Sequence, residues 1–284
     1  MQNPLTACLF PCLLFTVIGA ALAEDAIPMH QSITTKALLT AVTQRFQEVK
    51  PGPAFDSTIG LSSVGVKAVG EGEARFAAIV RDLSPTDRKS WPELKAAPFC
   101  VDVMVLTVHA DNPVADLTRE QVGGLFTGAI ATWKAVGGAD AAPVLVARIP
   151  TFATLDFFEA SFGIKRVLDG AVMRFKEGGP VAATPSNNEK ALAAVAGDPA
   201  AVTFASLAMV NELKAKGVPL KILAIGGVEP NQTNVQSGKY AAKRQFYIIT
   251  KGDPQGRVQD FVGFLLGAEG QKIVAAKGFI PLAP

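Results

Sequence analysis

A long apolar run in the middle of the chain sets the pattern of its secondary structure. It extends from Val101 to Val108 and is interrupted only by Asp102 and Thr107. Runs as apolar and β-branched as this one are typical of a strand that is buried on both faces, as in a parallel sheet. Residues 118–121 read TREQ, which is the capping-box pattern of a helix start. The apolar residues that follow predict a helix that ends at Thr127-Gly128.

The same alternation of strand and helix patterns continues on both sides of this stretch. Strands are predicted at residues 27–30, 55–61, 77–80, 143–147, 201–205, 221–225 and 246–250. Helices are predicted around residues 38–46, 64–69, 155–162, 166–175, 190–196 and 258–266, followed by a last one that ends at Gly278. Strands that alternate with helices indicate an α/β fold.

The first 23 residues have the features of a secretory signal peptide. Their apolar core, Leu9 to Ile18, is about ten residues long, whereas a membrane-spanning helix needs about 20. Ala21-Leu22-Ala23 follows as a cleavage site of the small-x-small type. An uncleaved amino-terminal anchor is the alternative. We expect export to the periplasm and no membrane span once the signal peptide is removed.

Composition and charge argue against several classes of protein. The formal net charge is +2, and no block of Lys and Arg is long enough to suggest nucleic-acid binding. The predicted mature chain of about 260 residues is long enough for one large or two modest domains. It keeps only Cys100, in an apolar context, which predicts a buried thiol and no internal disulfide. His30 and His109 are far apart in sequence and have no zinc-type spacing, so no metal or cofactor is expected.

The sequence gives little support to an enzyme. A serine nucleophile would need a histidine base, and neither histidine lies next to a nucleophile-elbow motif. Asp156 and Glu159 lie three residues apart on a predicted helix. Their favourable interaction with the positive end of the helix dipole explains them more simply than a role as a catalytic acid–base pair. No Walker or dinucleotide-binding fingerprint occurs. We therefore expect no catalytic residues; a structural or adhesive protein would instead need an exposed apolar patch.

Hydroxyl residues recur where a predicted strand ends and a helix begins. These positions are Ser32, Thr34 and Thr35, then Ser62 and Ser63, then Thr151 and Thr154. Arg81 and Arg148 also follow predicted strands. The first N–H groups of a helix have no partner within the helix and carry partial positive charge, so such places favour an oxyanion. Each of them taken singly is also explained as an ordinary N-cap.

Residues 111–138 carry a specific resemblance. They read DNPVADLTREQVGGLFTGAIATWKAVGG and closely resemble the middle segment of the phosphate-binding proteins of bacterial ABC transporters. In that family the segment is followed by a strand, an arginine and a GSGT helix start. Residues 270–281, GQKIVAAKGFIP, are similar to the family's carboxyl-terminal segment. The alternative is a generic α/β domain in which part of the pattern arises by chance.

The resemblance implies a two-lobed periplasmic binding protein, type II-like, with mixed sheets flanked by helices. Two crossover strands would join the lobes, around residues 100–108 and 246–250. Lobe one would then comprise residues 24–102 and 245–284, and lobe two residues 103–244. The ligand would lie in the cleft between the lobes, which would close on it by a hinge motion.

The resemblance also implies a set of ligand-binding residues. They are Ser32, Thr34, Thr35, Ser62, Ser63, Arg81, Arg148, Thr151 and Thr154. The sequence departs from the family where GSGTR becomes residues 151–155, TFATL, so that Phe152 replaces a serine and Leu155 replaces an arginine. Val80 also stands where a polar contact is usual. Tight binding of a dehydrated phosphate needs many donors, so these losses would lower the affinity by several orders of magnitude at about 1.4 kcal/mol per tenfold.

Two hypotheses about function follow. In the first, the protein is a secreted, monomeric solute-binding protein that takes phosphate or a related oxyanion and delivers it to a transporter permease. In the second, it is a divergent paralogue whose cleft binds another small ligand or a protein partner. Phe152 in the cleft would favour a ligand that is larger or less charged than phosphate.

Overall fold

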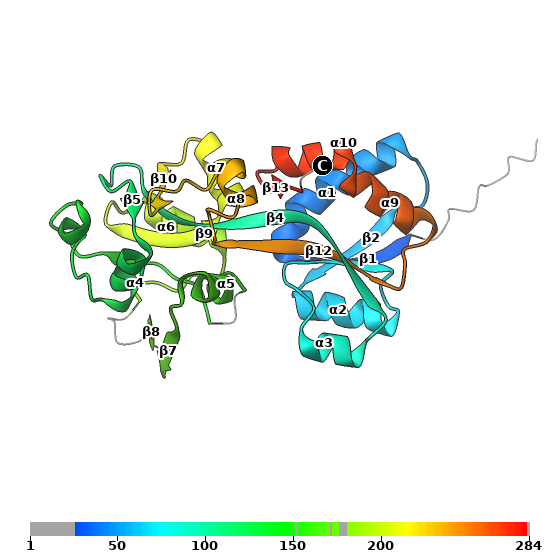
Figure 1. The fold of residues 1–284 in the computed structure, drawn as a ribbon, viewed down its shortest axis with the longest axis horizontal. Helices are drawn as coiled ribbons and strands as arrows, with labels where there is room; N and C mark the ends of the chain where they lie inside the picture. The colour runs from blue at the N-terminus through cyan, green and yellow to red at the C-terminus, as the bar shows by residue number, and fades with distance from the viewer. Residues whose placement is uncertain (1–25, 151–152, 171, 176–180, 283–284) are drawn as a thin grey trace, which may run out of the picture.

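The computed structural model describes residues 26–150, 153–170, 172–175 and 181–282. The predicted signal peptide, residues 1–23, lies outside these ranges. The chain forms two lobes that are joined by two long strands, β4 and β12, as the resemblance implied (Figure 1). Among the described residues, no helix is long and apolar enough to cross a membrane.

The two connecting strands pair with each other. β4 (Leu94–His109) and β12 (Lys243–Lys251) are antiparallel, with Lys243 opposite Val103 and Lys251 opposite Leu94. The register shifts between Phe246 and Tyr247, where a bulge interrupts the ladder. Both predicted crossovers fall within these strands.

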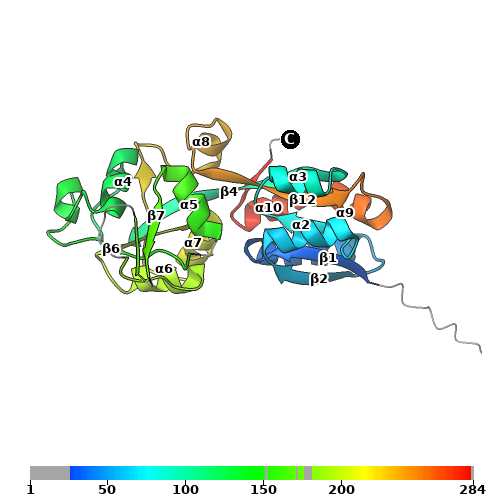
Figure 2. The same ribbon diagram turned by 90° about the horizontal axis from the view of Figure 1, so that it is seen from below.

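Lobe one is built on three parallel strands. Its elements are β1 (Ile27–Ser32), α1 (Lys36–Val49), β2 (Phe55–Gly60), α2 (Ser62–Glu71), β3 (Phe76–Ile79), α3 (Pro85–Ser90), α9 (Gly256–Leu266), α10 (Ala268–Ala276) and β13 (Ile280–Pro281). α1, α9 and α10 lie on one face of the strands, and α2 and α3 lie on the other (Figures 1 and 2). Side chains of β3 point alternately to the two faces. Phe76 and Ala78 pack in the apolar cluster on the side of α1, α9 and α10, whereas Ala77 and Ile79 pack in the cluster on the side of α2.

Lobe two contains shorter strands and a phenylalanine-rich core. Its elements are β5 (Asp116–Leu117), α4 (Arg119–Thr127), β6 (Val144–Leu145), α5 (Ala153–Phe162), β7 (Arg166–Asp169), β8 (Val172–Phe175), α6 (Asn188–Ala196), β9 (Ala201–Ser206), α7 (Leu207–Ala215), β10 (Leu220–Ile222), β11 (Ala224–Ile225) and α8 (Gln232–Gln236). In its core the rings of Phe158 and Phe204 stack with centroids 4.0 Å apart. Phe126 and Phe175 pack around them at 4.6–6.0 Å.

A nine-stranded mixed sheet runs through the described part of both lobes, in the order β2-β1-β3-β12-β4-β9-β6, with β10 and β13 also paired to β4. The apolar core changes over from one lobe to the other between Cys100 and Val103 on β4 and between Ala242 and Phe246 near β12. The predicted boundaries at residues 102/103 and 244/245 are compatible with this change and stay predictions.

The parallel strands of lobe one end at the same edge of the sheet. Ser32, the last residue of β1, lies opposite Gly60, the last residue of β2, and β3 runs parallel beside β1. α2 begins directly after β2, and Arg81 follows β3. In open α/β sheets, ligands bind beyond the carboxyl ends of the strands, so this edge is where a site is expected.

One predicted helix is wrong. Within the range 166–175, β7 (Arg166–Asp169) and β8 (Val172–Phe175) are paired antiparallel as a hairpin, in which Asp169 lies opposite Val172. Gly170 in the turn has φ +59°, a conformation that glycine adopts without strain. An aspartate–glycine pair between β-branched residues is a hairpin signal that overrides the weak helical spacing of the apolar residues.

Candidate functional site

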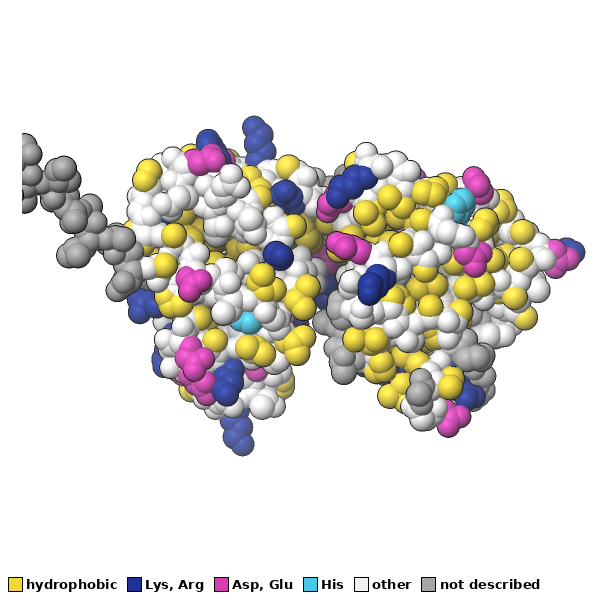
Figure 3. All heavy atoms as spheres, turned by 180° about the vertical axis from the view of Figure 1, so that it is seen from behind, with side chains coloured by type: hydrophobic (Ala, Val, Ile, Leu, Met, Phe, Trp, Pro, Cys, Tyr) yellow, Lys and Arg dark blue, Asp and Glu magenta, His cyan; other side chains and the backbone are white. Residues whose placement is uncertain are grey.

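A cleft of about 960 Å³ lies between the two lobes. One wall comes from the start of α2 and the residues after β3, the floor from β4 and β12, and the other wall from α5 and the start of α4. From behind, basic side chains lie on both sides of the narrow waist between the lobes, and acidic side chains lie near it on one side (Figure 3).

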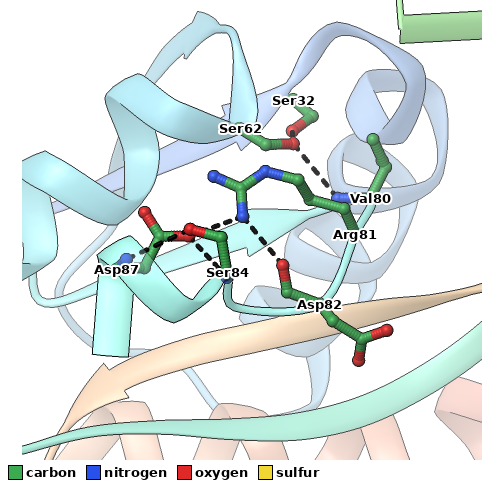
Figure 4. A network of polar contacts seen from close by, with 7 residues as sticks. All are labelled: Ser32, Ser62, Val80, Arg81, Asp82, Ser84 and Asp87. Atoms are coloured by element: carbon green, nitrogen blue, oxygen red, sulfur yellow. Dashed lines mark hydrogen bonds and ion pairs between the residues drawn. The ribbon is translucent and has the colours of Figure 1, made fainter. Parts of the chain in front are cut away.

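Two predicted serines meet behind the lobe-one wall: Ser62 lines the cleft, whereas Ser32 is buried and is not part of the described lining. Ser32 Oγ and Ser62 Oγ are 2.8 Å apart although 30 residues separate them in sequence. Ser62 Oγ also accepts a hydrogen bond of 3.2 Å from the backbone N–H of Val80 (Figure 4). The backbone of Val80 therefore makes a polar contact where its side chain cannot. The two hydroxyls share one hydrogen in their mutual bond, so the other hydroxyl hydrogen is available to a ligand.

The N-terminus of α2 has no side-chain cap. Its N-cap residue is Leu61, whose side chain has no polar group that could accept from the first turn. The N–H groups of Val64 and Gly65 bond to the carbonyl of Leu61, whereas no acceptor among the described residues takes those of Ser62 and Ser63. By contrast, α3 and α4 are closed by capping boxes. α2 thus presents unpaired N–H donors and the positive end of its dipole beside the cleft.

Arg81 lies next to these donors and is held by α3. Its Nη1 donates to the carboxylate of Asp87 at 2.6 Å and to the carbonyl of Asp82 at 2.7 Å (Figure 4). Asp87 also accepts from the N–H of Ser84, the N-cap of α3. Burial raises the pKa of Asp87, but the bonds from Arg81 and Ser84 together lower it further, so its pKa lies below the usual value. Both printed bonds of the guanidinium use Nη1, and Arg81 lines the cleft.

The floor of the cleft carries a buried ion pair. Arg244 donates to the carboxylate of Asp102 from Nη2 at 2.9 Å and from Nε at 3.2 Å. Asp102 also accepts from the hydroxyl of Ser206. The guanidinium of Arg244 lies over the ring of Phe157, 4.6 Å from its centroid, and Phe157 lines the opposite wall. The ion pair holds Arg244, on β12, against β4, and its guanidinium contacts α5 of lobe two.

Arg148 occupies a different environment. It is fully buried in lobe two and donates to Asn188 Oδ1 at 2.7 Å, Thr203 Oγ1 at 3.0 Å and the carbonyl oxygens of Ala147 and Phe204 at 2.6 and 2.8 Å. Burial lowers its pKa to about 9, so the guanidinium is still charged at neutral pH. Arg148 does not belong to the described lining of the cleft.

The other predicted residues are placed as follows. Thr35 is buried and donates to the carbonyl of Ser32 at 2.8 Å. Thr34 is half-buried, and both threonines belong to the short helix Ile33–Thr35 that precedes α1. Thr154 is buried near the start of α5. Within the described part of the lining, none of these three threonines appears. Thr151, like Phe152, lies outside the described residues.

Several residues of the cleft were not predicted from the sequence. They are Asp82, Arg119, Asp156, Phe157, Ser161, Lys243, Arg244 and Tyr247. A signal for Arg244 was present, because Asp102 interrupts an apolar strand, and a buried carboxylate needs a partner. Burial, together with the nearby Asp82, raises the pKa of Tyr247 to about 12, so this phenol stays neutral. Among the described residues, no three His, Cys, Asp or Glu side chains are grouped so that they could hold a metal ion.

Phosphate-binding proteins are among the relatives that this chain resembles in sequence. The phosphate-binding protein PstS of Bacillus subtilis is 28% identical over 268 residues, which cover 93% of this chain and 83% of that protein. PstS of Borreliella burgdorferi is 22% identical and covers 90% of each chain. These names confirm the resemblance and the expectation of a binding protein rather than an enzyme.

Solved structures share the fold. A crystal structure from Clostridium perfringens, assigned as a phosphate ABC transporter substrate-binding protein and containing bound phosphate, superposes with a TM-score of 0.74 at 26% identity; the match covers 91% of this chain and 100% of that one. An ABC-type phosphate transport receptor from Vibrio cholerae gives 0.72 at 24% identity, with the same coverage. A family model described as a PBP superfamily domain matches residues 30–269. The chain therefore belongs to the PBP superfamily.

Proposed function

We propose that the protein binds phosphate or a related oxyanion in the interlobe cleft, as the solute-binding component of an ABC transporter. The names of the PstS relatives and the phosphate in the Clostridium perfringens structure support this. The observation that carries the proposal is the uncapped N-terminus of α2, whose serines lie beside Arg81 at the cleft.

These groups suit an oxyanion for a physical reason. Unpaired N–H groups at a helix start point at a ligand and carry partial positive charge. Ser62 and Ser63 add hydroxyl donors without adding charge, and Arg81 supplies a full positive charge in a planar fork. Asp87 holds that fork in place, so less side-chain entropy is lost when the anion binds.

We propose Ser62, Ser63 and Arg81 as direct ligands. Ser32 would support Ser62 through the hydrogen bond between their hydroxyl groups. Thr34 and Thr35 would then support the loop that carries Ser32. Thr154, near the start of α5, and Thr151 are proposed to complete the site from lobe two after closure. Arg148, by its contacts, would stabilise lobe two beneath them.

The wider role follows from the same proposal. Residues 1–23 would direct export, and the mature protein would act as a monomer in the periplasm. The strands β4 and β12 would bend as the lobes close. A permease would accept the ligand from the closed form.

Thermal unfolding of the purified protein with added anions tests this proposal. The panel is phosphate, sulfate, molybdate and acetate at matched ionic strength. Ligand at a hundredfold excess over its dissociation constant should stabilise the native state by about 2.7 kcal/mol. A selective shift with phosphate is expected, whereas no shift with any oxyanion would contradict the proposal and favour the repurposed paralogue.

A further inference from the structure

Exposed apolar side chains alternate with the hydroxyl groups of the lobe-one wall. Ile33 follows Ser32 and is 55% exposed, and Leu61 precedes Ser62 and is also 55% exposed. Val64 follows Ser63 and is 51% exposed. Single exposed apolar residues are ordinary, but a cluster around polar ligand groups marks a binding surface.

Of these three residues, Leu61 lines the cleft, where further apolar side chains lie. Val80 is also part of the lining, although it is only 5% exposed. Tyr247, which is paired with Ile79 in the neighbouring strand, also lines the cleft. Phe157 faces them from lobe two, stacked on Arg244. A hydrated inorganic anion gains nothing from such surface, since it has no apolar part to remove from water.

Most of the strong donors, by contrast, come from the lobe-one wall, and lobe two adds Arg119. The N–H groups of Ser62 and Ser63, the free hydroxyl hydrogen and Arg81 all belong to lobe one. On the floor, Arg244 already serves Asp102, and Lys243 donates to the carbonyl of Val235 at 2.6 Å. The described groups therefore favour an anion whose oxygens face lobe one and whose fourth substituent faces the apolar surface.

We propose that the preferred ligand is a monosubstituted phosphate, namely a phosphate monoester or a phosphonate. Its three oxygens bind at Ser62, Ser63 and Arg81. Its organic group replaces the fourth oxygen and packs between Leu61 and Phe157. This inference rests on the proposed function, because it assigns a ligand class to the same site.

Isothermal titration of the purified protein with three probes tests the inference. The probes are inorganic phosphate, methylphosphonate and phenylphosphonate, at mildly alkaline pH where all three are doubly charged. We expect phenylphosphonate to bind about tenfold more tightly than phosphate, with methylphosphonate between them. Benzenesulfonate, which has the same ring but a single charge, controls for non-specific binding of the ring and should bind weakly.

Two variants assign the contact. Phe157→Ala should weaken phenylphosphonate about tenfold and change phosphate affinity less than about twofold. Leu61→Ala, on the opposite wall, should also weaken phenylphosphonate binding. This variant leaves the contact between Phe157 and Arg244 intact. Leu168→Ala is the matched control, because Leu168 is 53% exposed on the β7–β8 hairpin and should change neither affinity.

The outcomes separate the two proposals. Phosphate that binds as tightly as both phosphonates, or more tightly, would overturn this inference and leave the proposed function standing. Phenylphosphonate affinity that neither Phe157→Ala nor Leu61→Ala alters would overturn it as well. Absence of binding by all three anions would overturn both.

Discussion

The two lobes use one sequence pattern in different ways. In each, an arginine follows a strand, and hydroxyl residues lie near the start of a helix. In lobe one, Arg81 is 37% exposed and shares the cleft with Ser62 and Ser63. In lobe two, Arg148 is fully buried, and its hydrogen bonds all go to groups of its own lobe.

The difference lies in the acceptors that surround each guanidinium. Asp87 holds only Nη1 of Arg81, together with the carbonyl of Asp82. Three nitrogens of Arg148 are bonded to buried side chains and carbonyls. An arginine with unused donors at a cleft can bind a ligand, whereas one whose donors are used inside a core supports the fold. The following predictions test this contrast between lobes.

Removing Arg148 should have the largest effect. Arg148→Ala leaves Asn188 Oδ1 and the carbonyl of Phe204 without the donor that the structure gives them, and takes a donor from Thr203, whose hydroxyl keeps its bond to the carbonyl of Val146. The free energy of unfolding should therefore fall by about 3–5 kcal/mol. Urea denaturation measures the loss. Thr203→Val removes one of these bonds and should cost less. A loss below about 1 kcal/mol, together with lost phosphate binding, would instead place Arg148 in the site.

Removing Arg81 should affect binding instead of folding. Arg81→Met should weaken phosphate binding about 10- to 100-fold, because a charge-assisted hydrogen bond is worth about 1.5–3 kcal/mol. Its ion pair with Asp87 is partly exposed, so stability should change little. Arg174→Met is the control, since Arg174 is also 37% exposed and pairs with Asp169 at 2.9 Å on the lobe-two hairpin. Equal phosphate affinities of the two variants would remove Arg81 from the proposed site.

Much of the fold could be predicted from local sequence signals. The TREQ segment became the capping box of α4, with Thr118 and Gln121 bonded to each other's backbone N–H groups. The apolar run 101–108 lies within β4. The hairpin at 166–175 was missed because turn chemistry outweighed apolar spacing there.

The site could be predicted only in part. Helix-start patterns indicated Ser32 and Ser62, which do meet, but the same pattern does not report whether a side chain faces the cleft or the core. Arg244 lies 142 residues from its partner Asp102, and no local pattern gives such a pairing. The N-cap position of Leu61 was also missed, because the serines that follow it looked like the cap.

A side-chain cap on α2 should raise the stability of lobe one and weaken phosphate binding. Leu61→Ser places a hydroxyl where it can accept from the N–H of Ser63 or Val64, which should stabilise lobe one by about 1 kcal/mol. The same hydroxyl competes with the anion for that N–H, so phosphate binding should weaken. Thermal unfolding and titration measure the two effects. Tighter phosphate binding by this variant would contradict an open helix start as the anion site.

The smallest effect concerns pH and again separates the lobes. His30 is buried beneath the start of α2, between Gly60 and Gly65, and Nε2 lies 3.2 Å from the carbonyl of Leu61. Burial lowers the pKa of His30, against a weaker opposite effect of the Leu61 carbonyl.

Because the unfolded chain then binds this proton more readily than the native protein, stability is fully present above the unfolded pKa of about 6.5 and falls as pH decreases through it. Melting temperature measured between about pH 7.5 and pH 5 should show this decrease. His30→Gln should make the curve flatter in this range, whatever it does to stability at neutral pH. If the lobes unfold in separate transitions, only that of lobe one should lose its slope. An equal slope in the variant would show that the pH dependence arises elsewhere, and would leave His30 as a packing residue under the anion site.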